Sequence, residues 1–522
     1  MIKLFLIVVI FITLIKMSFI KSYVSTDFEV HRNWLAITNN LHIKYWYFDN
    51  TSKWTLDYPP LFAWFEYGLS KLAEKFDCNM TKLENIDYIS DNAKIFHKLS
   101  VIFSDLIYVV SVFKILSCKP ISKLLHNSLF STLTSIKLLG PFGLLLIDHI
   151  HFQYNGMLFG FLFLSIYNLM KNRELWAAFW FTVLLNFKHI YIYYAPAYGA
   201  YLFFHYCFVT VLENDKLEKR YFSFRRFLKL GSVVLAVFLV SFGPFIIMNQ
   251  LNQVISRLFP FDSRGLTHAY WAPNIWAIYN ALDMTLCRTI GKFFSLPFAT
   301  NEMTKGLVET YKHLILPNIN PLTTLILTVS SILPSLVKCR YTKSTTDFFK
   351  LLIICGWSAF IFGWHVHEKA ILMVTLPFMF LEILDRKCLA FGFYVTTISH
   401  YSLLPLIPTI PEYSLKISLF LACTCTHFVH INHMYGKDVL NTLSPIFKYH
   451  LIMLLPLWIF TDVIIPIFVP RYQFLPLMIT SLFCSVGIVI GYVKFYLYYW
   501  TNDDAWVLFQ KEKKISDSKK NQ

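Results

Sequence analysis

The sequence contains few charged residues. Asp, Glu, Lys and Arg make up 15% of its 522 positions, whereas hydrophobic residues make up 56%. A soluble protein could not bury that much apolar surface, so the composition excludes the soluble class. The ten cysteines lack a C-x-x-C pair and metal-ligand spacing, and the closest two are Cys423 and Cys425. We therefore expect small core residues rather than a disulfide framework or a zinc site.

Long apolar runs are abundant instead, and the mean hydropathy is +0.51. A run of about twenty mostly apolar residues can cross a ~30 Å hydrocarbon core as a helix. The sequence therefore predicts an all-α polytopic membrane protein with about fourteen transmembrane helices. The expected spans lie near residues 2–20, 97–117, 127–147, 156–170, 175–190, 192–212, 230–248, 313–337, 350–364, 370–385, 389–408, 413–432, 448–470 and 475–498. The first run has no small-residue cleavage site after it, which favours a retained signal anchor.

The Lys and Arg residues occupy alternate loops, which predicts the orientation of these spans. By the positive-inside rule the basic loops and both termini, including a tail at 499–522, are cytosolic. Topology thus explains the net charge of +16 without a nucleic-acid-binding stripe, and we expect no nucleic-acid partner. All the unusual polar motifs then share the opposite face, in segments 21–96, 148–155, 249–312 and 364–369.

Two of these motifs lie in the first of the segments. In Asp27-Phe-Glu-Val-His-Arg-Asn-Trp, helical spacing brings Asp27, His31 and Arg32 together. The acidic residue could activate a hydroxyl and Arg32 could hold a phosphate, although an interfacial amphipathic helix explains the motif as well. Asp57 and Tyr58 precede a double proline that forces an extended turn. Taken alone, Tyr58 is better explained as an interfacial anchor than as a platform for a sugar.

The other two motifs are short loops between expected spans. The first contains Asp148, His151 and Gln153, and we favour a hydrogen-bonded scaffold around a polar ligand over a metal site there. The second is flanked by apolar runs, where ionisable side chains cost free energy to desolvate and so point to a polar cavity. A solvated loop with a snorkelling lysine is the alternative. The ionisable residues of this second loop are His365, His367, Glu368 and Lys369.

Two further features lie on the same side of the expected membrane. Residues 257–276 combine Arg with aromatic residues, which suits a loop that folds over a substrate, although a plain cap fits equally. The sequons at Asn50 and Asn79 are consistent with a lumenal setting, and two such matches also arise by chance.

Several motifs in order resemble one known family. The strings DFEVHRNW, LDYPPLFAWFEY, DHIHFQYNG, RLFPF, AYWAPN and GWHVHEK resemble the dolichyl-phosphate-glucose-dependent glucosyltransferases of the endoplasmic reticulum, from about residue 22 to 500. The resemblance implies a single GT-C membrane domain over residues 1–522, with short amphipathic helices in its lumenal loops. The TDFEVHRNW and HAYW segments are most similar to the members that add the second glucose.

The resemblance implies a concrete reaction and address. Glucose would pass from dolichyl phosphate glucose to the monoglucosylated oligosaccharide on dolichyl diphosphate, with inversion to an α-1,3 bond at the lumenal face of the endoplasmic reticulum membrane. Asp27 would be the general base and His367 the first candidate to contact the donor phosphate, with Lys369 and Arg32 as other candidates. Glu368 would position Lys369 or a sugar hydroxyl. The further residues expected to bind substrate, with sugar contacts assigned to the aspartates, His151 and Gln153, are His31, Asp57, Tyr58, Asp148, His151, Gln153 and His365. No cofactor or metal is expected, because no Asp-x-Asp motif occurs at this face. The terminal Lys519 and Lys520 resemble a dilysine retrieval signal, and a chance basic tail is the alternative.

Three alternatives remain open from the sequence. Within the same fold, the enzyme could transfer the first glucose or a mannose, because few contacts distinguish one hexose from its epimer. A secondary transporter should show internal repeats and mid-span ionisable pairs, and neither is evident. A lumenal scaffold subunit would keep the fold and lose the chemistry.

Overall fold

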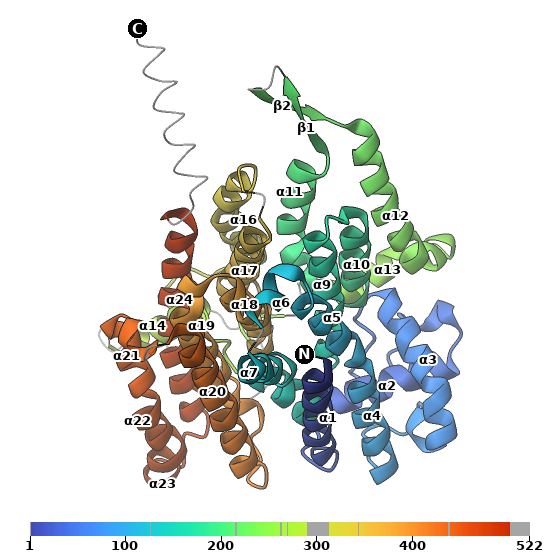
Figure 1. Cartoon of the computed structure of the whole chain (residues 1–522). Coiled ribbons are helices and arrows are strands. Elements are labelled where there is room, and N and C mark those ends of the chain that lie inside the picture. Colours follow the sequence, from blue (N-terminus) through green and yellow to red (C-terminus); the bar gives the residue numbers. More distant parts are fainter. Residues whose placement is uncertain are drawn as a thin grey trace. The chain divides into compact units, whose positions relative to one another are not determined.

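The computed structural model describes residues 2–125, 127–213, 217–260, 264–268, 270–289, 313–342, 344–436 and 439–501 (Figure 1). Almost all of the described secondary structure is helical, as the composition predicts. The exception in this part of the chain is an antiparallel hairpin of β1 (Phe208–Glu213) and β2 (Leu217–Phe222), in which Phe208 pairs with Phe222. The expected span at 192–212 is therefore not one helix, since α11 (Ala195–His205) gives way to β1, where β-branched residues favour a strand.

Eight of the described helices are long and apolar enough to cross a membrane. They are Asp91–Leu116, Ser128–Phe152, Phe224–Ile247, Pro321–Lys338, Thr345–Phe362, Tyr413–Met434, Pro445–Phe468 and Leu475–Thr501. The prediction of a multi-span membrane protein is confirmed in this coarser form, and the count of about fourteen is not confirmed. Other expected spans form shorter helices, such as the apolar α9 (Asn155–Met170) and α10 (Glu174–Phe187).

The chain divides into two compact units. Unit 1 comprises Met1–Ala195, Tyr206–Pro260 and Leu406–Met434. Within it α5 packs on α9, α9 on α10, α2 on α3, and α1 on α7. Besides the elements already given, its helices are α1 (Ile2–Ser18), α2 (Thr26–Asn40), η1 (Ile43–Tyr45), α3 (Pro60–Phe76), η2 (Cys78–Thr81), α4 (Asp91–Ser104), α5 (Leu106–Leu116), α6 (Lys119–Leu124), α7 (Ser128–Leu139), α8 (Phe142–Leu144), η3 (Leu145–Phe152), η4 (His189–Tyr194), α12 (Phe224–Ile247), α13 (Leu251–Leu258) and α20 (Tyr413–Tyr435).

Unit 2 comprises Pro196–His205, Phe261–Pro405 and Tyr435–Gln522. In it α17 packs between α16 and α18, and α24 contacts α14, α17 and α19. Its further helices are α14 (Ile275–Thr289), α16 (Pro321–Lys338), α17 (Thr345–Phe362), η7 (Glu368–Ile371), α18 (Leu372–Leu384), η8 (Arg386–Cys388), α19 (Leu389–Tyr401), η10 (Val439–Thr442), α21 (Pro445–Ile452), α22 (Leu454–Ile459), η11 (Phe460–Ile464), α23 (Ile465–Phe468) and α24 (Leu475–Thr501). The 3-10 turn η9 (Leu404–Leu406) lies at the boundary of the units.

The N-terminal helix is held in unit 1 by a buried ion pair. Lys16 Nζ lies 2.6 Å from Asp105 Oδ2, and both side chains are almost fully enclosed. The same carboxylate oxygen lies 2.8 Å from His149 Nε2. Since removing one partner would leave a buried charge uncompensated, α1 is tied to α5 and η3 by more than apolar packing.

The third expected span is interrupted where its sequence places Gly140 and Pro141. Helix α7 ends at Leu139, the chain passes through α8, and residues 145–152 form the wider π-helix η3. Proline cannot donate the backbone hydrogen bond that a continuous helix requires. The interruption delivers the polar DHIHF segment to the end of the span. All ten cysteines lie in the described residues as free thiols; seven are buried, Cys423 is half-buried, and Cys78 and Cys425 are exposed rather than core residues.

Candidate active site

Asp27 lies in the first turn of α2, where the helix dipole favours a carboxylate. Gln153 Nε2 donates to Asp27 Oδ2 over 2.7 Å, and His151 Nδ1 lies 3.3 Å from the same oxygen. The Asp27 side chain is 21% exposed, whereas that of His151 is 9% exposed. The structure therefore brings two of the predicted motifs together across 126 positions of sequence. We call Asp27, Asp148, His151, Gln153 and Asn155 the Asp27 cluster.

The end of η3 aims Gln153 at Asp27. Phe152 has φ 88°, a left-handed conformation that is costly for a bulky residue, and Gln153 is extended. Lys98 Nζ donates to the carbonyl oxygens of His149 and Ile150 over 2.7 and 2.8 Å, which satisfies acceptors that the helix end leaves open. The strained backbone at Phe152 is thus next to carbonyl groups that Lys98 holds in place. Strained backbone supported in this way is common at functional sites.

Asp148 and Asn155 support Gln153 from behind. The fully buried Asp148 accepts from the Gly156 backbone N–H over 2.6 Å and from Asn155 Nδ2 over 2.9 Å. Asn155 Nδ2 also donates to Gln153 Oε1 over 2.8 Å, and Lys188 Nζ lies 3.5 Å from Asn155 Oδ1. A Cβ at position 156 would collide with Asp105 Oδ1, so a side chain there would require the Asp105 carboxylate to move. Asp148 is enclosed by protein, and it contacts the scaffold of the cluster.

His31 lies behind the same cluster in an aromatic cage. Its Nδ1 is 2.7 Å from Glu66 Oε1, and both side chains are buried. Burial raises the pKa of Glu66, and the contact with His31 partly offsets that shift. The rings around His31 are those of Trp34, Tyr58, Phe62, Phe152 and Tyr154. His31 thus packs among the rings next to the cluster. Tyr58, one of these rings, and Asp57 are half-buried and lie in the segment that precedes α3.

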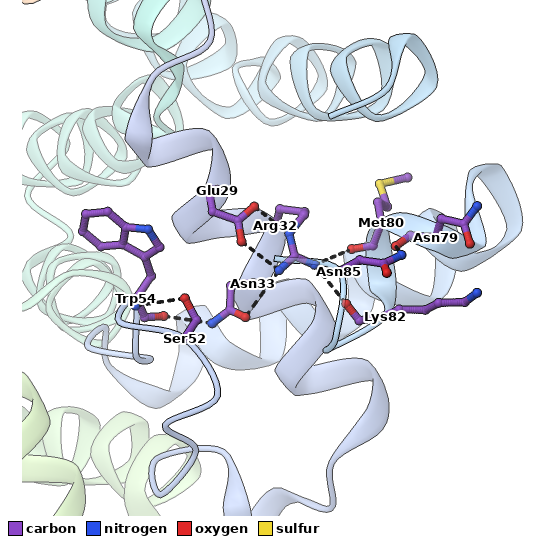
Figure 2. Close-up of polar contacts among 9 residues, drawn as sticks. All are labelled: Glu29, Arg32, Asn33, Ser52, Trp54, Asn79, Met80, Lys82 and Asn85. Carbon is purple, nitrogen blue, oxygen red and sulfur yellow. Dashed lines mark hydrogen bonds and ion pairs between the residues drawn. The ribbon is translucent and has the colours of Figure 1, made fainter. Parts of the chain in front are cut away.

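Arg32 is enclosed rather than presented to a ligand (Figure 2). Its Nε and Nη2 donate to the two carboxylate oxygens of Glu29 over 2.7 and 2.8 Å, and Nη1 donates to the carbonyls of Met80 and Lys82 over 3.1 Å each. A fifth contact joins Nη2 to Asn33 Oδ1 at 3.5 Å. A guanidinium has five N–H donors, so these contacts use its full capacity. Arg32 thereby fastens α2 to η2 in the described structure.

Replacing Arg32 by Met is expected to destabilise the protein by about 3–5 kcal/mol, because Glu29 would remain buried without its partner. Thermal unfolding in detergent measures this loss. The double variant Arg32→Met/Glu29→Gln is expected to regain part of the stability. An unchanged melting temperature with a raised KM for the donor would instead assign Arg32 to phosphate binding, as the sequence first suggested.

The GWHVHEK motif forms a second cluster in unit 2, between α17 and η7. His268 and His367 have ring centroids 4.4 Å apart, and His367 Nδ1 lies 2.8 Å from Glu368 Oε2. His365, whose φ is 50°, holds the loop by placing Nδ1 2.8 Å from the Gly265 carbonyl oxygen. Glu368 is buried, while the His367 side chain is 33% exposed. We call His268, His365, His367 and Glu368 the His367 cluster.

Residues 264–268 run beside this motif, so that part of the long loop is a component of the cluster. Thr267 forms a parallel bridge with Val366, and the backbone N–H of His365 donates to the Leu266 carbonyl over 3.0 Å. Further along, Trp276 Nε1 donates to the Gly363 carbonyl over 2.9 Å. The predicted closure of residues 257–276 over a substrate stays a prediction, and 261–263 and 269 lie outside the described residues.

Acid is expected to destabilise the His367 cluster. Burial, with neighbouring His367, lowers the pKa of His268 to about 3. An unfolded histidine binds its proton near pH 6.5, so between these values the folded chain binds fewer protons and its stability falls as the pH falls. The melting temperature should therefore drop from pH 7.5 to pH 5, and His268→Gln should reduce that drop. The matched variant His42→Gln, at an exposed histidine, should leave it unchanged. An equal drop in the wild type and His268→Gln would contradict the account.

The described residues contain one group with metal-ligand spacing. One ligand atom from each of His268, His367 and Glu368 lies within 4.8 Å of the others, and two imidazoles with a carboxylate are a known zinc ligand set. An imidazole can instead donate a hydrogen bond to an oxyanion, and this is the use that we expect for His367. Turnover in the presence of a chelator separates the two uses.

Three residues in or next to these clusters were not predicted as site residues: Asn155, Lys188 and His268. Asn155 ends the polar DHIHFQYN run, and Lys188 interrupts an apolar run where a cation requires a reason. His268 lies in the long aromatic loop, and nothing in its sequence spacing links it to position 367. The first two therefore carried a usable signal, whereas the third depends on tertiary structure.

A helical chain with several membrane spans has the features of a membrane-bound transferase when it carries a partly exposed carboxylate held by side-chain donors and a partly exposed histidine backed by a buried carboxylate. The family model for the ALG6, ALG8 glycosyltransferase family matches residues 12–495, and the chain belongs to this family. The predictions of an enzyme and of its glycosyltransferase class are confirmed.

Relatives with assigned names are similar over almost their whole length. The chain is 44% identical over 502 residues to a Bos taurus protein named dolichyl pyrophosphate Glc1Man9GlcNAc2 alpha-1,3-glucosyltransferase, covering 93% of this chain and 94% of that protein. The Mus musculus protein of that name is 44% identical over 501 residues, covering 93% of each chain. The Dictyostelium discoideum protein is 38% identical over 579 residues, covering 93% of this chain and 92% of its own.

Proposed function

We propose that the protein is an inverting α-1,3-glucosyltransferase that transfers the second glucose from dolichyl phosphate glucose to the monoglucosylated lipid-linked oligosaccharide. The observation that carries the proposal is the placement of Asp27. On a chain 44% identical to relatives named for this reaction, Asp27 is partly exposed at a helix N-terminus and held by Gln153. A carboxylate so placed can accept the proton of a bound hydroxyl.

The chemistry is a single displacement at the anomeric carbon of the donor. Asp27 takes the proton from the acceptor 3-hydroxyl. The hydroxyl oxygen forms the bond to C1 of the donor glucose while the bond from C1 to the phosphate oxygen breaks. Dolichyl phosphate leaves with the electron pair and gains one negative charge. Because the β-linked donor is attacked from the opposite face, the product is α-linked. The proton remains on Asp27 until solvent removes it.

The departing phosphate requires donors rather than an acid. His367 is suited to this role because its side chain is partly exposed and its Nδ1 faces the buried Glu368 carboxylate at 2.8 Å. The carboxylate orients the ring, so that Nε2 can donate to a phosphate oxygen. Lys369, which follows Glu368, would add positive charge. This role requires no metal and no cofactor.

The remaining predicted substrate contacts divide by their surroundings. Asp57 and Tyr58 are half-buried, and Lys188 Nζ lies 5.0 Å from the centre of the Tyr58 ring, so we propose that both residues contact a sugar. His31, Arg32 and Asp148 are enclosed and bonded to protein groups, so we propose that they support the site. His365 is proposed to fix the loop that carries His367.

The proposal includes a location. The enzyme would span the endoplasmic reticulum membrane as a single GT-C domain, with the active site lumenal, both termini cytosolic, and the bilayer holding both lipid-linked substrates. Lys519 and Lys520, which suggest retrieval from the cytosol, lie outside the described residues, as do 290–312 of the long lumenal loop. The support is the alternation of basic loops along the chain.

Defined acceptors test the proposal directly. Purified protein is given dolichyl phosphate glucose with either the monoglucosylated or the unglucosylated nine-mannose lipid-linked acceptor, and the products are identified by mass and linkage. We expect one α-1,3-linked glucose on the monoglucosylated acceptor and little product from the other. Transfer only to the unglucosylated acceptor would assign first-glucose transfer. No transfer to either would favour a transporter or scaffold.

A further inference from the structure

We propose that Gln153 is a positioning residue for Asp27, and that Asn155 and Asp148 fix the direction in which its amide points. The inference rests on the proposed function and extends it, because it assigns these motif residues to the orientation of the base rather than to sugar binding. The contacts run from Asp148 through Asn155 and Gln153 to Asp27, entirely within unit 1, and we call this series the amide relay.

The amide of Gln153 has two unlike ends, and only one orientation suits Asp27. With Nε2 toward Asp27 it donates a charge-assisted hydrogen bond over 2.7 Å. Turned over, it would place a carbonyl oxygen against the carboxylate, which repels and favours the protonated acid. The ionised form of Asp27 therefore depends on the group that holds the other end of the Gln153 amide, Oε1.

Asn155 supplies that hold, since its Nδ2 donates to Gln153 Oε1 over 2.8 Å. The direction of the Asn155 amide is itself set from two sides. Its Nδ2 faces Asp148 Oδ1 at 2.9 Å, and its Oδ1 faces the ammonium of Lys188 at 3.5 Å. Asp148 is anchored in turn by the Gly156 backbone N–H over 2.6 Å. Each side-chain amide thus has one orientation that forms all of these hydrogen bonds. In that orientation Gln153 Nε2 donates to Asp27.

The amide relay explains the enclosure of Asp148 better than a sugar contact does. Asp148 is fully buried and both of its carboxylate oxygens accept hydrogen bonds from residues 155 and 156. A carboxylate in that position acts on a ligand only through Asn155 and Gln153. His151, which lies 3.3 Å from the same Asp27 oxygen, completes the support.

Exchanging the residues at positions 148 and 155 tests the orientation of the Gln153 amide while keeping the local packing. In Asp148→Asn/Asn155→Asp, the new amide at position 148 can accept from the Gly156 N–H and donate to the new carboxylate at position 155, which can also pair with Lys188. The local hydrogen bonds and the net charge are kept, whereas Gln153 now faces an acceptor and must turn its oxygen to Asp27. We expect a melting temperature near that of the wild type, with kcat reduced roughly tenfold to hundredfold, the effect of one hydrogen bond to a charged group. The acidic limb of the kcat/KM profile should move to higher pH.

Purified enzyme with both lipid-linked substrates is the assay system, and KM for the donor and thermal unfolding are measured alongside kcat. Recovery of wild-type turnover and pH profile in the exchanged variant would overturn the amide relay. Should the exchange not fold, Gln153→Met keeps the length of the side chain and lacks the donor, and it should show the same loss of kcat with an intact melting temperature. Wild-type turnover in Gln153→Met would likewise overturn the proposal. Turnover retained in Asp27→Asn would instead exclude Asp27 as the base. Failure of the amide relay and failure of the proposed function are therefore distinguishable.

Discussion

Replacing Asp27 by Asn is expected to lower kcat by about 10²–10⁴-fold, the contribution typical of a positioned general base. The amide keeps the size of the side chain and cannot accept the proton from the attacking hydroxyl. The variant should fold, because Asp27 lies at the partly exposed start of α2, and its Oδ2 contacts are with side chains rather than the core of the helix. KM for both substrates should change little.

The measurement is glucosyl transfer by the purified variant, with the melting temperature as a check of folding. Asp49→Asn is the matched control: it lies in the segment between η1 and α3, and its carboxylate accepts from Thr51 rather than from the cluster. Its turnover should equal that of the wild type. Full activity in Asp27→Asn would remove Asp27 as the base and leave the mechanism without a proton acceptor.

Replacing His367 by Ala is expected to lower kcat/KM by about 10²–10³-fold, the usual cost of removing one donor that stabilises charge in the transition state. The negative charge on the phosphate grows as the bond to glucose breaks, so most of the loss should appear in kcat. His367→Gln keeps an N–H donor and should retain more activity than His367→Ala. His42→Ala, at an exposed histidine of unit 1, is the control.

A chelator distinguishes the two chemical uses of the His367 cluster. With phosphate held by His367 itself, turnover should be the same with and without EDTA. Loss of activity in EDTA and its return with Zn²⁺ would show that His268, His367 and Glu368 hold a metal, and the expectation of metal-independent catalysis would then be wrong.

The sequence predicted much of the Asp27 cluster because topology limits where its parts can lie. Asp27 follows the first apolar run and DHIHFQYNG follows the third, so alternation of basic loops places both at one face. The structure then sets Gln153 and Asp27 at 2.7 Å. Helical spacing predicted that Arg32 lies beside Asp27 and His31. Its guanidinium instead pairs with Glu29 and with carbonyls of η2 and the residue after it, about fifty positions away, which no local pattern reveals.

Other features depended on tertiary structure. Hydropathy located the apolar runs, and Pro141 marks the interruption of the third run in the sequence. It did not show that the run after α11 continues as a strand. The direction of an amide such as Gln153 is set by a chain of partners, and the part played by His268 depends on a backbone bridge between Thr267 and Val366. Neither has a local signal along the chain.

The central claim is that Asp27 takes the proton from the acceptor hydroxyl. A structure of the purified enzyme with a non-transferable donor analogue and the monoglucosylated acceptor tests it directly. The account predicts the Asp27 carboxylate in hydrogen-bond contact with the acceptor 3-hydroxyl, with that oxygen about 3–3.5 Å from the anomeric carbon. An acceptor bound with its 3-hydroxyl away from Asp27 would contradict it.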